Sequence, residues 1–98
     1  MSRPVILRPE AVDDVTAARD WYEQQREGLG EEFVESVDFV LARLAATPEM
    51  HQVVFQDARR AKLRRFPYVV YYRVLSDRVE VLAVMHGRRD PGAWQSRV

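Results

Sequence analysis

The feature that most constrains this fold is a pair of strand-like runs, residues 68–75 (YVVYYRVL) and 78–86 (RVEVLAVMH), separated only by Ser76 and Asp77. Both runs are rich in β-branched and aromatic side chains, which favour strands. So short a connection predicts a β-hairpin, with Val74 facing Val79. Because successive residues of a strand point to opposite faces, this register predicts which side chains lie together.

One face of the predicted hairpin is apolar throughout and is expected to lie beneath helices. It consists of Tyr68, Val70, Tyr72, Val74, Val79, Val81, Ala83 and Met85. The opposite face is expected to be uncovered. It carries Val69, Tyr71, Arg73, Glu80, Leu82, Val84 and His86. If the strand pairing continues beyond the hairpin, Arg65 lies near Arg88 on the same face as His86. The uncovered face would then combine apolar side chains with arginines and a histidine.

The first half of the chain has helical periodicity. A short strand is predicted over residues 4–8, and apolar residues at helical spacing then predict two amphipathic helices. The glycines within residues 28–30 interrupt the helical pattern, and Thr47-Pro48 ends it. A link this short predicts an antiparallel helical hairpin.

These elements predict a small α+β domain. A further strand is expected over residues 60–66, whereas residues 52–55 form too short a run to assign. The order β-α-α-β-β-β places the helical hairpin on one face of a small, largely antiparallel sheet. Since 98 residues suffice for one modest core, residues 1–98 are expected to form a single domain.

Charge is sorted along the chain, although the formal net charge is zero. Residues 1–50 carry 5 Lys and Arg against 11 Asp and Glu, whereas residues 51–98 carry 10 against 4. This asymmetry predicts a basic working surface in the second half.

Composition and motifs exclude several classes of function. Without cysteine the chain has no disulfide framework, thiolate zinc site or cysteine nucleophile. No segment approaches the ~20 apolar residues of a membrane span, and the first residues do not resemble a secretory signal. We therefore expect a cytoplasmic protein with no membrane partner. A glycine-rich phosphate loop, a paired-histidine motif and a serine elbow are also missing, so no cofactor or metal is expected.

Most candidate functional side chains also have a structural interpretation. Arg73 opposite Glu80 is most simply a cross-strand ion pair, and Tyr71 is more simply a packing residue. His86 is the one plausible general acid or base on the predicted open face. For this residue a structural role and a functional role are equally consistent with the sequence. Four arginines fit a solubilising rim and the binding of phosphate or an acidic partner equally well. They are Arg64, Arg65, Arg88 and Arg89.

Other conspicuous residues are expected to be structural. Trp94 is predicted to fold back onto the core, and Trp21 to belong to the core of the helical hairpin. Asp14 is predicted to match the dipole at the start of the first helix. His51 is isolated, is predicted to lie in a loop, and is assigned no role.

The segment RRFPYVVYYRVLSDRVEVLAVMHGRRDPGAW, residues 64–94, follows a strand and two helices. In this order it resembles the RelE/ParE superfamily, the toxins of bacterial type II toxin–antitoxin modules. The resemblance covers essentially the whole chain. The tyrosine-rich strand and the His-Gly-Arg-Arg segment place it closer to the ParE-like side. It implies a growth-inhibiting toxin with a cognate antitoxin as its partner.

The superfamily divides by target. ParE-like members are taken to poison DNA gyrase, whereas RelE-like members are ribosome-dependent mRNA endonucleases. For a ribonuclease, the resemblance implies catalytic roles for Arg65 in phosphate binding, His86 in proton transfer and Arg88 in charge stabilisation. The chain has Val69 where such ribonucleases often have arginine, and it offers no tyrosine or histidine close to its end. Gyrase inhibition is thus favoured, with a ribonuclease and a non-toxic antitoxin-binding module as alternatives.

For a binding role, the basic face and tail are expected to make the contacts. They comprise Lys62, Arg64, Arg65, Tyr71, Arg73, Arg88 and Arg89. An acidic or amphipathic antitoxin segment is expected to cover the sheet face that presents Val69, Leu82 and Val84 among the arginines.

Overall fold

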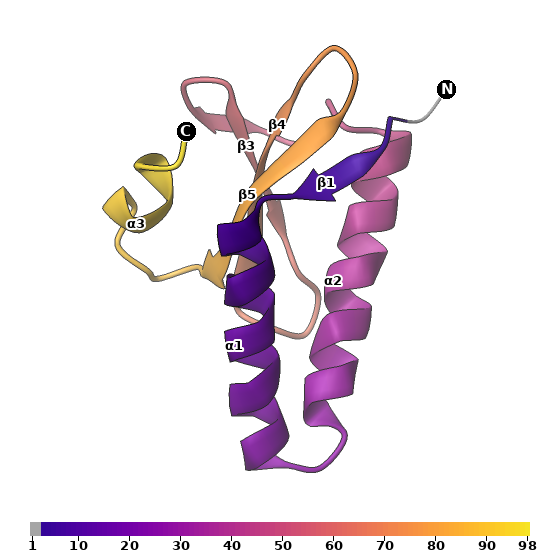
Figure 1. Cartoon of the computed structure of the whole chain (residues 1–98), viewed down its shortest axis with the longest axis vertical. Coiled ribbons are helices and arrows are strands. Elements are labelled where there is room, and N and C mark those ends of the chain that lie inside the picture. The colour runs from indigo at the N-terminus through magenta and orange to yellow at the C-terminus, as the bar shows by residue number, and fades with distance from the viewer. Residues whose placement is uncertain (1–2) are drawn as a thin grey trace.

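The computed structural model describes residues 3–98 and places two long helices against a five-stranded sheet (Figure 1). In chain order the elements are β1 (Val5–Leu7), α1 (Pro9–Gln25), α2 (Leu29–Ala46), β2 (Val53–Phe55), β3 (Ala58–Lys62), β4 (Tyr68–Val74), β5 (Val79–His86) and α3 (Gly92–Gln95). The strand order is β1-β5-β4-β3-β2, with β1 parallel to β5 and the other pairs antiparallel. The predicted α+β class is confirmed, and β2 and α3 add to the predicted order.

The turn between α1 and α2 is closed by Glu23 and two glycines. Gly28 has φ of 88°, a left-handed conformation that glycine adopts without strain. The carboxylate of Glu23 accepts hydrogen bonds from the backbone N–H groups of Gly28 and Gly30, each at 3.0 Å, which satisfies donors at the start of α2. A side-chain carbon at Gly30 would lie only 2.7 Å from the Arg19 carbonyl oxygen of α1. Glycine therefore both interrupts the helices and permits their close approach.

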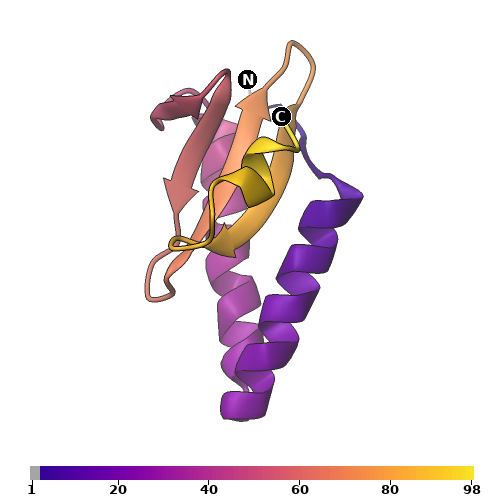
Figure 2. The same ribbon diagram turned by 90° about the vertical axis from the view of Figure 1, so that its left-hand side faces the viewer.

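Two apolar clusters cover opposite faces of the sheet. On the helix side, Ala11 of α1 and Phe33 and Leu44 of α2 belong to one cluster with Val70 and Tyr72 of β4. The opposite side, here called the outer face, holds Ala58, Val69, Tyr71, Leu82, Ala83 and Met85 with Trp94 of α3. Figure 2 shows α3 lying across the side of the sheet that faces away from the long helices. The prediction of an uncovered outer face was therefore wrong.

A β-bulge interrupts the pairing of β4 with β5. Tyr72 pairs with Val81 as predicted, but Tyr71 pairs with Ala83, so Leu82 is an extra residue on β5. One extra residue reverses the face to which all later side chains of a strand point.

The bulge moves four side chains to the faces opposite those predicted. Ala83 and Met85, expected beneath the helices, belong to the outer-face cluster. Val84, expected on the outer face, is buried in the helix-side cluster. His86 likewise faces the helix side, where its ring lies 5.7 Å from that of Tyr68. The predicted grouping of His86 with the outer-face residues was thus wrong.

The two tryptophans have opposite environments. Trp94 is 5% exposed and stacks on Tyr71 with ring centres 4.1 Å apart and planes 10° apart, which confirms that it folds back onto the core. Trp21 is 55% exposed, so its assignment to the helical core was wrong. It makes an edge-on contact with Tyr22, with ring centres 5.1 Å apart.

An ion pair fastens the end of the chain to α1 across β5. Arg97 Nη1 donates hydrogen bonds to Asp14 Oδ2 at 2.7 Å and to the Leu82 carbonyl at 3.0 Å. The same carboxylate accepts the Val84 N–H at 3.0 Å. Because β1 pairs with β5 only as far as Val81, these side chains satisfy backbone groups at the bulged edge that no strand covers. Asp14 thus has a bonding role that its position near a helix start did not indicate.

Candidate functional site

The predicted site residues lie in several places rather than on one basic face. Arg64 and Arg65 contact α2, and Lys62 lies on β3 opposite Val69 of the outer face. His86 borders a groove beside α1. The single basic face expected from the sequence does not form, because these side chains lie beside different elements.

Arg65 is engaged with the start of α2. Its Nη2 donates to Glu32 Oε1 at 2.7 Å, and its guanidinium lies 5.9 Å from the centre of the Phe66 ring. Hydrogen bonds from Arg65 and Arg26 hold the pKa of Glu32 below its usual value. Among residues 3–98, no hydrogen bond or ion pair joins Arg65 to His86. Of the three predicted catalytic residues, His86 and Arg88 are therefore joined by a hydrogen bond, and Arg65 is bonded to neither within the described chain.

The other predicted residues of the sheet are held by local contacts. Arg73 pairs with Asp57, through Nε and Nη2 at 3.2 and 3.1 Å, rather than with Glu80 as predicted. Its Cα still lies opposite that of Glu80, so the register was right and the ion pair wrong. Tyr71 is buried beneath Trp94, and α3 would have to move before Tyr71 could meet a partner.

His86 lines a groove between α1 and the end of β5. This α1–β5 groove consists of two adjoining hollows of about 260 and 370 Å³, which share Trp21, Tyr68 and His86. Asp14, Ala17, Tyr22, Pro67 and Arg89 also line it. Its walls are mainly aromatic or apolar, with a carboxylate and a guanidinium at one end.

The polar groups of the α1–β5 groove include an imidazole and two phenols. His86 Nδ1 accepts the Arg88 N–H at 3.0 Å, so the neutral ring carries its proton on Nε2. Burial raises the pKa of Tyr68 despite the opposing charge of Arg89, and burial also raises the pKa of Tyr22. Both phenols therefore keep their protons near neutral pH. The groove therefore offers hydrogen-bond donors and aromatic surfaces.

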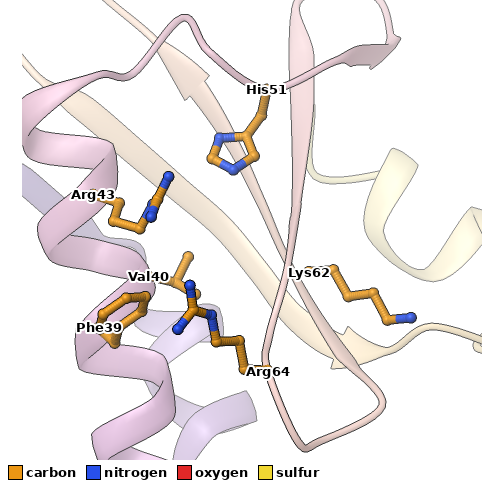
Figure 3. A pocket seen from close by; sticks show the side chains of 6 residues that line it. All are labelled: Phe39, Val40, Arg43, His51, Lys62 and Arg64. Atoms are coloured by element: carbon orange, nitrogen blue, oxygen red, sulfur yellow. The ribbon is translucent and has the colours of Figure 1, made fainter.

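A second pocket, absent from the sequence-based expectations, lies between α2, the following loop and β3. This α2–β3 pocket has a volume of about 180 Å³ and is lined by Phe39, Val40, Arg43, His51, Lys62 and Arg64 (Figure 3). Lys62 points away from the other side chains in that view. Little in the sequence indicated this pocket, because Arg43 lies in the acidic half and His51 in a short loop.

The arrangement of a helical hairpin against a mixed sheet is shared with a solved structure from a toxin–antitoxin system. The solved structure described as "Chromosomal ParDE TA system from P. aeruginosa" superposes with a TM-score of 0.66, covering 87% of this chain and 96% of that chain. The sequence identity is 15%, so this likeness establishes the fold alone.

The sequence itself identifies the family. The family described as "ParE toxin of type II toxin-antitoxin system, parDE" matches residues 5–91, so this chain belongs to the ParE toxin family. "Toxin ParE2" from Mycobacterium tuberculosis, strains CDC 1551 / Oshkosh and ATCC 25618 / H37Rv, is 34% identical over 62 residues. The match covers 63% of this chain and 59% of those relatives. The predicted RelE/ParE resemblance, on its ParE-like side, is confirmed.

No helix within residues 3–98 combines the length and the apolar character that crossing a bilayer requires.

Proposed function

We propose that this ParE-type toxin inhibits DNA gyrase by binding it, and that a cognate antitoxin neutralises it. The observation that supports binding over RNA cleavage is that the candidate catalytic groups Arg65 and His86 contact different partners. Arg65 is engaged with Glu32 at 2.7 Å, whereas His86 lies in the α1–β5 groove. A ribonuclease needs its phosphate-binding and proton-transferring groups around one RNA linkage. Membership of the ParE family supports the same choice.

Arg88 and Arg89 are proposed to make the first contact with gyrase or its DNA complex. Both are exposed in the turn after β5. Neither has an ion-pair partner among the described residues. Unpaired surface cations attract an acidic partner and raise the rate of encounter.

Purified protein is expected to block the supercoiling of relaxed plasmid by gyrase and to accumulate cleaved DNA, both measured on agarose gels. Arg88→Glu is expected to raise the concentration for half-inhibition about fivefold, because attraction becomes repulsion. The matched control is Arg78→Glu, which reverses the charge of an arginine in the turn at the other end of the hairpin, where it lies 3.0 Å from Asp77. This control is expected to inhibit like the unaltered protein.

Two other outcomes would replace this proposal. Unaltered supercoiling at micromolar protein, together with cut mRNA in a translating extract, would assign a RelE-like ribonuclease. His86→Ala would then reduce cleavage about 100-fold, whereas gyrase inhibition does not require that imidazole as an acid. Neither activity, and no growth arrest on expression without antitoxin, would leave a non-toxic antitoxin-binding module.

The α1–β5 groove is the proposed docking site for the antitoxin. Trp21 stands at its rim with 55% of its surface exposed, and Arg89 supplies a cation nearby. An antitoxin segment with one large apolar anchor and a neighbouring carboxylate would complement both features. The outer face, where docking was expected from the sequence, buries Val69 and Leu82 beneath α3 and offers less apolar surface.

Trp21→Ala is expected to weaken antitoxin binding about tenfold or more, because exposed aromatic anchors dominate such interfaces. The measurement is calorimetric titration with the purified cognate antitoxin. Val12→Ala is the matched control, since Val12 lies on the same helix and is 48% exposed but does not line the groove. Equal losses for the two variants, or none for Trp21→Ala, would place the antitoxin elsewhere.

A further inference from the structure

The α2–β3 pocket gathers cationic and aromatic side chains from three separate segments. Phe39 and Arg43 come from α2, His51 from the loop after it, and Arg64 from the connection between β3 and β4 (Figure 3). The guanidinium carbon of Arg64 lies 4.8 Å from the centre of the Phe39 ring, and that of Arg43 lies 5.9 Å from it. We propose that this pocket binds a phosphate group, either as the free ion or within a nucleic-acid backbone.

The positive charge of the pocket is not balanced by carboxylates. No Asp or Glu is among its described lining residues. Glu49 and Glu32 are paired with other arginines. Glu32 and Glu35 line an adjoining hollow that Arg64 also borders, but neither of these described carboxylates forms an ion pair with Arg64. Within residues 3–98, neither Arg43 nor Arg64 has an ion-pair partner. Two unpaired guanidinium groups at one concave site favour a multivalent anion.

Hydrogen bonds fix the segments that carry these side chains. Ser36 Oγ donates to the carbonyl of Arg64 at 3.0 Å, which ties the β3–β4 connection to α2. Arg59 Nη1 donates to the carbonyls of Glu49 at 3.0 Å and His51 at 2.7 Å, which holds the loop after α2. A site that is ordered before binding loses less entropy when its ligand arrives.

His51 gives the pocket a group that responds to a bound anion. Its Nδ1 is buried without a hydrogen-bond partner among the described residues. Burial, followed by the charges of Arg43 and Arg59, lowers the pKa of His51, so the ring is neutral at pH 7. Tyr72, with its ring centre 6.2 Å away, also faces the imidazole. An anion beside the arginines would favour the protonated ring, so phosphate binding and the pKa of His51 should be coupled.

Phosphate suits the pocket better than a carboxylate does. Inorganic phosphate presents several acceptor oxygens and carries up to two charges near neutral pH, which two guanidinium groups can match, whereas a carboxylate carries one charge. A backbone phosphodiester also carries one charge, but successive phosphates along the strand offer each guanidinium group a partner. Phe39 is 46% exposed beside the cations and provides a surface on which a base of a nucleic acid can stack. This site is separate from the α1–β5 groove and does not depend on the choice of gyrase as target.

The test is a titration of the ¹⁵N-labelled protein with sodium phosphate at constant ionic strength, followed by NMR. The amides of the pocket and the His51 imidazole are expected to shift saturably with Kd of about 1–10 mM, and the pKa of His51 is expected to rise. Arg64→Gln is expected to weaken binding about fivefold, because it removes one charge and its fork of donors. Arg78→Gln is the matched control, an arginine in the β4–β5 turn, and is expected to bind like the unaltered protein.

The source of the phosphate is distinguished with a single-stranded oligodeoxynucleotide of about 12 nucleotides. Binding at least about tenfold tighter than phosphate, with displacement by phosphate at His51, would assign the site to nucleic acid. Binding no tighter than phosphate would assign it to the free ion. A linear, unsaturated response up to about 50 mM phosphate, equal weakening by both variants, or a response to a glutamate-rich peptide alone would overturn the proposal.

Discussion

Replacing Trp94 with alanine is expected to lower the free energy of unfolding by about 3–5 kcal/mol. The indole is 5% exposed and lies 4.1 Å from the Tyr71 ring in a stacked arrangement. Its removal would eliminate these contacts and expose apolar side chains of the outer face, such as Val69 and Met85, to water. Urea denaturation followed by circular dichroism measures the loss directly.

The other tryptophan provides a matched control of identical chemistry. Trp21→Ala is expected to cost about 1 kcal/mol or less, since Trp21 is 55% exposed and loses mainly its edge-on contact with Tyr22. The chain contains only these two tryptophans, so each variant retains one indole that reports on one environment. If Trp94→Ala cost no more than Trp21→Ala, α3 could not be docked on the sheet in solution.

The covering of the outer face was partly predictable from the sequence. Alternation placed Val69 and Leu82 on a face that was expected to be open, and apolar side chains on an open sheet face usually indicate that something covers it. The residue that covers this face could also be recognised in the sequence, because Trp94 was expected to fold back onto the core. The sequence pattern did not indicate that Trp94 packs on the outer face, where it buries Tyr71. Tyr71 therefore contributes to packing.

The register of the hairpin was predicted correctly only near the turn, where polar residues interrupt the apolar sequence. Arg73 and Glu80 interrupt the apolar residues near the turn, and the pairing there is as expected. Residues 81–85 (VLAVM) are all apolar and all buried, because both faces of β5 are covered. Without alternation, nothing local reveals an inserted residue, so the bulge at Leu82 and the resulting position of His86 could not be foreseen.

The candidate site was predicted less well than the fold, because the tertiary structure determines which ion-pair partners its charged side chains meet. Arg73 has Asp57 within reach as well as Glu80, and Arg65 reaches Glu32 of α2. Exposed ion pairs differ by less than about 1 kcal/mol, so strand order alone does not select among them. The positive φ of 69° at Arg65 also changes the direction of the chain within the β3–β4 connection, where the prediction continued a strand.

The ion pair between Asp14 and Arg97 is expected to produce the second large loss of stability. Asp14→Ala and Arg97→Ala are each expected to lower the free energy of unfolding by about 2–3 kcal/mol. The side chains are 16% and 19% exposed, so the loss should be smaller than the about 3–5 kcal/mol typical of fully buried pairs. Each variant leaves the opposite charge without its partner. Each also frees one backbone group of β5, the Val84 N–H or the Leu82 carbonyl.

A double-mutant cycle separates this coupling from the individual losses. The double variant is expected to lose about 1–2 kcal/mol less than the sum of the single variants, because neither charge then remains unpaired. Asp13→Ala, an exposed carboxylate in the same turn, is the control and should change stability by about 0.5 kcal/mol or less. Additive losses would mean that the two side chains act independently.

Hydrogen exchange at one amide tests the role of Asp14 at the strand edge. The Val84 N–H is expected to exchange faster in Asp14→Ala than in Arg97→Ala, because only the first variant removes its acceptor. Equal exchange rates in the two variants would contradict this role. A faster rate in Asp14→Ala alone would show that a carboxylate of α1 substitutes for a neighbouring strand beside the bulge. The bulge, α1 and the segment that covers the outer face would then be stabilised as one unit.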